Sequence, residues 1–124
     1  MTAPEIDPLL LDPTRLSITA LLAATRWAEF KFVRDSLNLS DSALSKQIST
    51  LGKRGLVEVK KGYVGKTPRT WLNLSRDGHL TLQAHLAALQ DIATRSAQHV
   101  SGGDEDGVGV AGGDLGMGTG GGGG

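Results

Sequence analysis

The sequence of 124 residues predicts a mainly α-helical domain with one small β-hairpin. Aliphatic residues recur at helical spacing in four segments, and the hairpin falls between the third and the fourth of them. From Gly102 to Gly124, glycine fills 13 of 23 positions, and such a segment cannot bury enough apolar area to offset the entropy of ordering it. We therefore expect one folded domain over residues 1–100 and a disordered, Gly-rich acidic tail over residues 101–124.

The first two helices are predicted by a start signal and by apolar spacing. Asp12 can cap a helix whose first position is Pro13, where the missing N–H does no harm. That helix has apolar side chains on two faces and needs two packing partners: Ile18, Leu21 and Leu22 on one face, and Leu16, Ala20 and Ala23 on the other. In EFKFVRDSLNLS, apolar residues lie three and four positions apart, which predicts a short second helix that ends near Asn38.

The third helix is expected from Ser40, its capping residue, to about Arg54, where Gly55 supplies a left-handed stop. Its apolar face consists of Leu44, Ile48 and Leu51. The opposite face carries hydroxyls and lysines, and no acidic residue occurs between Ser42 and Val57. Solvent-exposed helices usually gain from Glu–Lys pairs at four-residue spacing, so this composition is unusual for a face that meets only water.

The hairpin and the last helix follow the third helix. LVEVKK and RTWLNL have strand-like content and flank GYVGKTP, whose glycines and proline predict the turn of a hairpin with a basic tip. Ser75 can cap the last helix, although Gly78 weakens its first turn. Four apolar residues of this helix repeat at spacings of four, three and four, as in a seam between paired helices: Leu82, Leu86, Leu89 and Ala93.

The net charge of zero hides a segregation of charge along the chain. Residues 40–76 hold eight basic residues against Asp41 and Glu58, a net charge of +6. Residues 1–39 carry a net charge of −1, and residues 77–124 carry −5. A contiguous basic segment of this kind indicates contact with a polyanion.

The order of these elements and three motifs, LSDSALSKQISTL, GLVEVKKG and PRTWLNLS, resemble the winged helix-turn-helix domains of bacterial MarR-like and ArsR-like transcriptional regulators, in particular their compact single-domain group. The resemblance covers about Leu9 to Leu89. It implies a DNA-binding regulator with a recognition helix over about residues 41–54 in the major groove. It also implies a wing over about residues 62–69 on the adjacent minor groove or its phosphates. We expect a repressor of transcription.

The expected DNA-contacting residues combine this resemblance with the chemistry of the grooves. Hydroxyls suit a helix whose backbone lies close to base edges, lysines reach phosphates, and carboxylates would repel the duplex. On the recognition helix the expected contacts are Ser40, Ser42, Ser45, Lys46, Gln47, Ser49 and Lys53. At the hairpin tip they are Lys66, Thr67 and Arg69. Because serine both donates and accepts hydrogen bonds, these residues do not define an operator sequence.

Apolar surface left over on the first and last helices predicts a two-fold homodimer. The expected dimer contacts are Leu16, Leu82, Leu86, Leu89 and Ala93. The two recognition helices would then lie about one DNA turn apart, ~34 Å, on a pseudo-palindromic operator of double-stranded DNA. The sequence identifies no effector, so a small-molecule signal stays open.

Other interpretations of the same residues stay open. A winged helix also serves as a protein-protein interaction module without DNA binding. The third helix could present an ordinary solvated face, the hairpin tip could be a solubilising turn, and the acidic tail could compete with DNA or be inert. Trp27 could pack in the core or at an interface, or it could line a ligand pocket at a dimer interface. Tyr63 could touch DNA or pack the turn, whereas Trp71 is expected to pack the hairpin onto the core.

Enzymatic and metal-dependent functions are disfavoured by what the sequence lacks. It has no cysteine, no G-x-S-x-G, no HExxH and no phosphate loop, so we expect neither catalysis nor a cofactor. His79 and His85 are six residues apart, ~240° around a helix, so one chain cannot bring both to one metal ion. No segment suits a membrane span and MTAPEIDP lacks the features of a signal peptide, which predicts a cytoplasmic protein.

Overall fold

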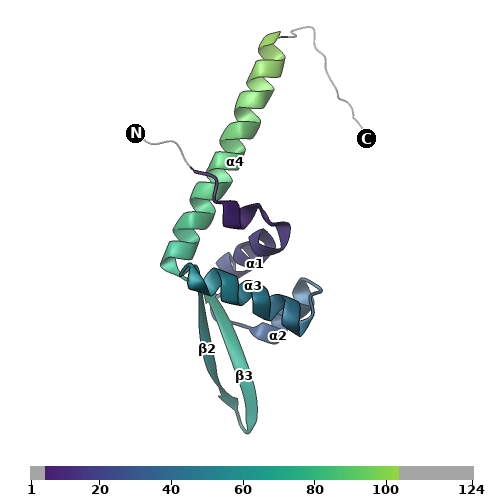
Figure 1. Ribbon diagram of the computed structural model, residues 1–124, viewed down its shortest axis with the longest axis vertical. Coiled ribbons are helices and arrows are strands. Elements are labelled where there is room, and N and C mark those ends of the chain that lie inside the picture. The colour runs from purple at the N-terminus through teal and green to yellow at the C-terminus, as the bar shows by residue number, and fades with distance from the viewer. Residues whose placement is uncertain (1–4, 104–124) are drawn as a thin grey trace. The chain divides into compact units, whose positions relative to one another are not determined.

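A computed structural model describes the backbone of residues 5–103 and the side chains of residues 5–98. Its elements, in chain order, are η1 Pro8–Leu11, α1 Pro13–Ala23, β1 Ala28–Glu29, α2 Phe30–Ser36, α3 Asp41–Lys53, β2 Val57–Val64, β3 Thr67–Leu74 and α4 Arg76–Gly103 (Figure 1). The chain divides into two units, Met1–Ala88 and Leu89–Gly124, and α4 contributes residues to both. The predicted class, mainly α with a small hairpin, is confirmed.

The predicted start signals of three helices are confirmed by their hydrogen bonds. The Asp12 carboxylate accepts from the Arg15 N–H at 3.0 Å and caps α1. The Ser40 hydroxyl accepts from the Ala43 N–H at 3.1 Å and caps α3. The Ser75 hydroxyl accepts from the Gly78 N–H at 2.9 Å at the start of α4. Each bond satisfies a backbone donor that has no partner inside its own helix.

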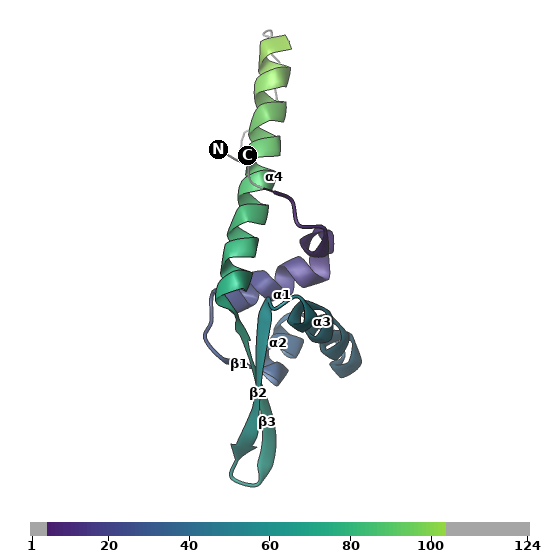
Figure 2. The ribbon, with the colours of Figure 1, turned by 60° about the vertical axis from the view of Figure 1, so that its left-hand side comes forward.

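The sheet has three antiparallel strands in the order β1-β3-β2 (Figure 2). The strand β1 was missed from the sequence because two residues are too few to show alternation. It pairs Ala28 with Leu72 and Glu29 with Trp71, so it attaches the chain between α1 and α2 to the hairpin. Trp27, just before β1, has a positive φ of 50°, and its N–H donates to the Asn73 side chain at 3.3 Å.

The hairpin is longer than predicted, and its turn is shorter. Gly62–Pro68 was expected to form the turn, but β2 and β3 pair as far as Val64 and Thr67. The turn holds only Gly65 and Lys66, and Gly65 takes the positive φ of +64° that a tight hairpin turn requires. Pro68 is tolerated inside β3 because β3 pairs there only with β2. The prediction therefore misplaced the hairpin tip.

The core lies between the three-stranded sheet, α1 and α3. Its apolar side chains are Leu10, Ile18, Leu22, Ala28, Val33, Leu44, Ile48, Leu51, Leu56, Val57, Leu72, Leu74 and Leu82. The predicted apolar faces of the first and third helices both contribute to it. Figure 1 shows the β2–β3 hairpin projecting away from α1, α2 and α3, so much of its length carries exposed side chains.

Two expected dimer contacts pack in or against the core of their own chain. Leu82 is 5% exposed and is part of the core cluster. Leu16 is partly buried and packs against the same cluster. The assignment of Leu82 is therefore corrected, because a side chain already covered within one chain offers little apolar area to a partner. Leu16, like Leu89, keeps part of its side chain exposed and stays a predicted dimer contact. In Met1–Ala88, the large apolar residues that α4 leaves exposed are Leu80 and Leu86.

In the second unit, α4 continues from Leu89 through residues 101–103, which the sequence analysis assigned to the tail. Ile92 and Ala93 are exposed there, and Asp91 pairs with Arg95 at 3.0 Å. The rest of the expected tail, residues 104–124, lies outside the described residues. Within the part of the chain that the structure describes, no helix is long and apolar enough to cross a membrane.

The segment before α1 is attached to the domain by polar contacts of Asp7. Its N–H donates to His85 Nδ1 at 3.0 Å, and His85 on α4 is fully buried. Its carboxylate accepts from the Arg54 guanidinium at 2.8 Å, just after α3. The bond from Arg54 is the main reason why the pKa of Asp7 lies below its ordinary value of 3.8.

We expect Asp7→Asn to remove a pH-dependent part of the stability. Because the folded-state pKa of Asp7 is lowered, its contribution is present above the unfolded pKa and is lost as the pH falls through the folded pKa. Urea unfolding should show a wild-type advantage of no more than about 1 kcal/mol near pH 6 that shrinks towards about pH 3. An advantage of equal size at both pH values would contradict this assignment.

Gly78 lies where α4 begins against the base of the hairpin. A Cβ at this position would overlap the carbonyl oxygen of Leu56 and the side chain of Leu74. The glycine that weakens the predicted helix is therefore required by the close approach of backbone to backbone.

Gly78→Ala should destabilise the domain by about 1–3 kcal/mol in chemical denaturation, because the added methyl group overpacks this junction. Gly52→Ala is the matched control, since Gly52 is also helical and an added Cβ there would meet only Val57 O at an ordinary 3.8 Å. The control should gain about 0.5–1 kcal/mol from helix propensity. A gain of stability in both variants would show that the junction can relax.

Candidate nucleic-acid interface

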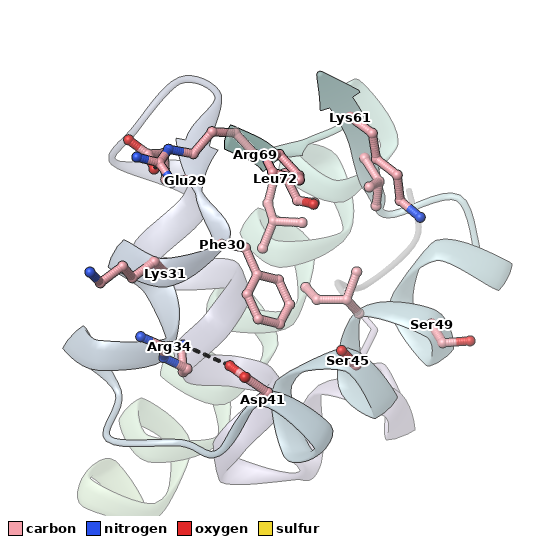
Figure 3. A pocket seen from close by; sticks show the side chains of 14 residues that line it. Glu29, Phe30, Lys31, Arg34, Asp41, Ser45, Ser49, Lys61, Arg69 and Leu72 are labelled. Atoms are coloured by element: carbon pink, nitrogen blue, oxygen red, sulfur yellow. Dashed lines mark hydrogen bonds and ion pairs between the residues drawn. The ribbon is translucent and has the colours of Figure 1, made fainter. Parts of the chain in front are cut away.

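A groove with a volume of about 600 Å³ lies between α2, α3 and the β2–β3 hairpin. Its apolar lining includes Phe30, Ile48, Val59 and Leu72, and the rest of the lining carries cations, hydroxyls and two carboxylates. Figure 3 shows Lys61 of β2 on one side of the groove and Ser45 and Ser49 of α3 on the other. The complete lining is Glu29, Phe30, Lys31, Arg34, Asp41, Ser45, Ile48, Ser49, Val59, Lys61, Pro68, Arg69, Thr70 and Leu72.

Most of the expected contact residues on α3 share one exposed face. Ser42, Ser45, Lys46, Ser49 and Lys53 are all exposed, opposite the buried Leu44, Ile48 and Leu51. Ser45 and Ser49 also line the groove. Ser40 is exposed as well, but its hydroxyl caps α3 and lies 3.3 Å from the Ser42 hydroxyl. The helix thus presents short polar side chains and two lysines to solvent.

Gln47 does not belong to this face, and its predicted reach to a base is corrected here. Its side chain is half-buried, and Oε1 accepts a hydrogen bond from Arg15 Nη1 of α1 at 3.0 Å. Arg15 also donates from Nε to the Leu9 carbonyl at 2.7 Å. Gln47 therefore fixes α3 to α1. Helical periodicity alone could not show this, because the partner is 32 positions away in the sequence.

Two cations on α2 were missed by the sequence analysis. Lys31 and Arg34 line the groove on the same face of this helix, three residues apart. Arg34 donates to Asp35 at 2.8 Å and to Asp41 at 2.7 Å, so it ties the end of α2 to the start of α3. Its bond to Asp35 is the main cause of the lowered pKa of that carboxyl. The signal for them in the sequence was their three-residue spacing, which places both side chains on one face of a helix.

The three hairpin residues expected to contact DNA occupy two different places. Lys66 lies in the turn, as expected, whereas Thr67 and Arg69 lie inside β3. Arg69 pairs in register with Gly62, and its Nε lies 3.3 Å from the Glu29 carboxylate. Thr67 pairs with Val64 directly beside the two-residue turn, whereas Arg69 lies further along β3, so placing Arg69 at the tip was wrong. Both stay candidates for DNA contact from positions along the strand.

Lys60 and Lys61 are neighbours in sequence but have different surroundings. Lys61 lines the groove. Lys60 lies with its Nζ 4.7 Å from the ring centre of Trp27 and 5.7 Å from that of Trp71, within the range of cation–π attraction. Trp71 therefore packs with Lys60 and Trp27 on the hairpin. Trp27 lies beside Lys60 and is not part of the core cluster, so only its packing in the core is corrected.

This arrangement suits the binding of a negatively charged ligand. Lysines and arginines from α2 and the hairpin line a concave surface together with two serine hydroxyls of α3, and the adjoining exposed face of α3 carries two further lysines. Such groups bind phosphates and read the edges of bases. No cluster of metal-binding side chains occurs among the described residues. The fold and the groove together define a winged helix-turn-helix, in which α2 and α3 form the helix-turn-helix and the β2–β3 hairpin is the wing.

Comparisons with known proteins agree with this class. Residues 14–93 match the family described as winged helix DNA-binding domain. A transcriptional regulator homologue from Pyrococcus horikoshii OT3 is 28% identical, with a TM-score of 0.65 over 69% of this chain and 85% of that one. An uncharacterized protein of Methanocaldococcus jannaschii is 28% identical over 72 residues, which cover 58% of this chain and 78% of that one.

A further likeness supports the fold alone. The M. tuberculosis transcriptional regulator MOSR, whose structure is a complex with DNA, is 15% identical, with a TM-score of 0.57 over 80% of this chain and 78% of that one. Because the family match spans more than half of the sequence, the chain belongs to the winged helix DNA-binding domain family.

Substitutions of the adjacent residues Lys46 and Gln47 should differ in their effect on the free energy of unfolding. Gln47→Leu should lower the free energy of unfolding by about 1–2 kcal/mol, because it leaves the charged Arg15 donor without its acceptor. Lys46→Met should change it by no more than about 0.5 kcal/mol, since Lys46 is exposed. Urea unfolding of both variants checks this difference. Equal stabilities would refute the structural role of Gln47.

Proposed function

We propose that this protein is a sequence-specific transcriptional regulator that binds double-stranded DNA as a homodimer and represses transcription. In this proposal α3 lies in the major groove and the wing lies on the adjacent minor groove or its phosphates. The observation that carries the proposal is the face of α3. The chain has no carboxylate from Ser42 to Val57, a stretch that includes all of α3 after Asp41. The exposed face of α3 adjoins a groove lined by cations from α2 and the wing.

This surface carries both kinds of side chain that DNA recognition uses, those that bind phosphates and those that bind base edges. Phosphate contacts supply sequence-independent affinity, and contacts to base edges supply specificity. We assign Lys31 and Lys61, which line the groove, and Lys66, in the turn of the wing, to phosphates. Lys46 is the long exposed donor on the middle of α3, so it is the side chain that we assign to a base.

The homodimer rests on apolar side chains that the described structure leaves exposed. Leu80 and Leu86 on α4 are 53% and 45% exposed, and Ile92 is 53% exposed in the second unit. Leu16, Leu89 and Ala93 stay within this proposal, whereas the buried Leu82 does not. Two recognition helices related by a two-fold axis would read a pseudo-palindromic operator with half-sites ~34 Å apart. As a regulator of transcription, the protein would act in the cytoplasm.

An alternative function, binding of another protein without DNA, has one observation in its favour. Tyr63 and Val64, next to the turn of the wing, are 71% and 55% exposed. Exposed apolar side chains at the end of a hairpin suit a protein surface. The two functions differ in salt dependence, because only DNA binding releases condensed counterions.

The first test is a titration of the protein into a labelled duplex of its own upstream region, with unrelated duplex as competitor, at about 50 and 200 mM salt. We expect binding that survives the competitor, weakens steeply with salt and saturates at two chains per duplex. Absence of binding at low salt would refute the proposal and favour a protein partner for the wing.

Within this assay, Lys61→Gln and Lys60→Gln form a matched pair. Both remove one positive charge from adjacent positions of β2, but only Lys61 lines the groove. Lys61→Gln should reduce the slope of log affinity against log salt by about 0.9, the value of one lost phosphate contact. Lys60→Gln should leave this slope unchanged. Equal slopes for the two variants would place the DNA on another surface.

A further inference from the structure

An ion pair lies at the edge of the groove, between β1 and β3. The Arg69 Nε and the Glu29 Oε1 are 3.3 Å apart, and both residues line the groove (Figure 3). Arg69 belongs to the central strand of the sheet and Glu29 to the short strand β1 beside it. The arginine that the sequence places closest to the wing tip is thus held by a carboxylate of the same chain.

The cations of the groove fall into two groups. Arg34 pairs with Asp35 and Asp41, and Arg69 pairs with Glu29. Lys31 and Lys61 form no ion pair with any side chain that the structure describes. A phosphate can bind the two lysines directly. To bind Arg69 at its Nε, the phosphate must first displace the Glu29 carboxylate.

This displacement changes the charge balance of binding. When a lysine without an acidic partner neutralises a phosphate, the counterion of the phosphate is released. When Arg69 does so, the freed Glu29 carboxylate remains beside the phosphate, where it repels the duplex and attracts a cation back. The net gain from Arg69 is therefore smaller than that from Lys61, although both residues carry the same charge.

We infer that Glu29 is an intramolecular competitor for Arg69 that limits the sequence-independent affinity of this surface for DNA. The inference rests on the proposed DNA-binding function and deepens it. Glu29 is a positioning residue in this role, because it acts on the duplex through Arg69. Glu29 keeps the Arg69 guanidinium oriented at the groove edge. Arg69 adds to DNA affinity only when a phosphate replaces the Glu29 carboxylate.

The ion pair is poorly suited to a purely structural role. The Glu29 side chain is 45% exposed and the Arg69 side chain is 38% exposed. Solvent-exposed ion pairs add little to folding stability. The attachment of β1 to β3 is secured by the backbone pairing of Glu29 with Trp71 and of Ala28 with Leu72. Removal of the carboxylate should therefore leave the fold intact.

The test compares Glu29→Gln with Glu58→Gln in the titration at about 50 and 200 mM salt. Both variants lose one exposed carboxylate, but Glu58 lies on β2, bonds Asn73 at 3.0 Å and does not line the groove. We expect Glu29→Gln to bind unrelated duplex about threefold more tightly at the lower salt and to steepen the salt slope by about 0.9. Glu58→Gln should leave the slope at the wild-type value.

The Arg69→Gln substitution then shows whether Glu29 acts through Arg69. In the wild-type background it should flatten the salt slope less than Lys61→Gln does. In the Glu29→Gln background it should abolish the whole increase in slope. An increase that persists without Arg69 would reduce Glu29 to a general repulsive charge and overturn the inference.

The outcomes separate this inference from the proposed function. If the wild-type protein binds duplex and Glu29→Gln has the wild-type slope, the competition is refuted and the DNA-binding function stands. If the wild-type protein and Glu29→Gln both fail to bind duplex, the proposed function itself is refuted. Thermal unfolding of each variant confirms that the protein compared is folded.

Discussion

The junction around Gly78 is the constraint on which the geometry of the groove depends. Four elements meet there, because the chain leaves α3, enters β2, returns from β3 and begins α4 within a few ångströms. The Ser75 hydroxyl donates to the Gly55 carbonyl at 2.6 Å, and the Ser75 N–H donates to the Leu56 carbonyl at 2.9 Å. The wing begins and ends at this junction, so its direction relative to α3 is set there. A Cβ at position 78 would overlap the Leu56 carbonyl oxygen and the Leu74 side chain, and would force α4 away from the base of the wing.

Charge is distributed over the domain in a way that matches this geometry. The cations brought together at the groove come from α2 and the wing, and the adjoining face of α3 carries two lysines. The carboxylates near them are paired: Asp41 with Arg34, and Glu29 with Arg69. The pairing of Asp41 also explains how an acidic residue can begin the recognition helix. Its charge favours the helix N-terminus, and Arg34 neutralises it towards the groove.

Local signals predicted most of the fold, whereas long-range contacts limited the prediction of the site. The caps at Asp12, Ser40 and Ser75 were predictable because each bond spans only three residues. Gln47 was assigned to the wrong partner because its orientation is decided by Arg15 on another helix. The hairpin tip was misplaced because glycine and proline were taken as turn residues. Their positions in the strands are set by the Trp71 ring beside Gly62 and by the missing partner strand at Pro68.

Two lysines of β2, Lys60 and Lys61, show how one strand can both stiffen the wing and line the groove. Successive side chains of a strand point to opposite faces, so Lys60 and Lys61 cannot share a surface. Lys60 covers Trp27 and Trp71 and joins the start of β1 to both strands of the hairpin. A two-stranded ribbon that projects from a domain is weakly stable alone. The contacts of Lys60 with Trp27 and Trp71 therefore hold the wing in place. Lys61 consequently keeps a defined position on the groove side.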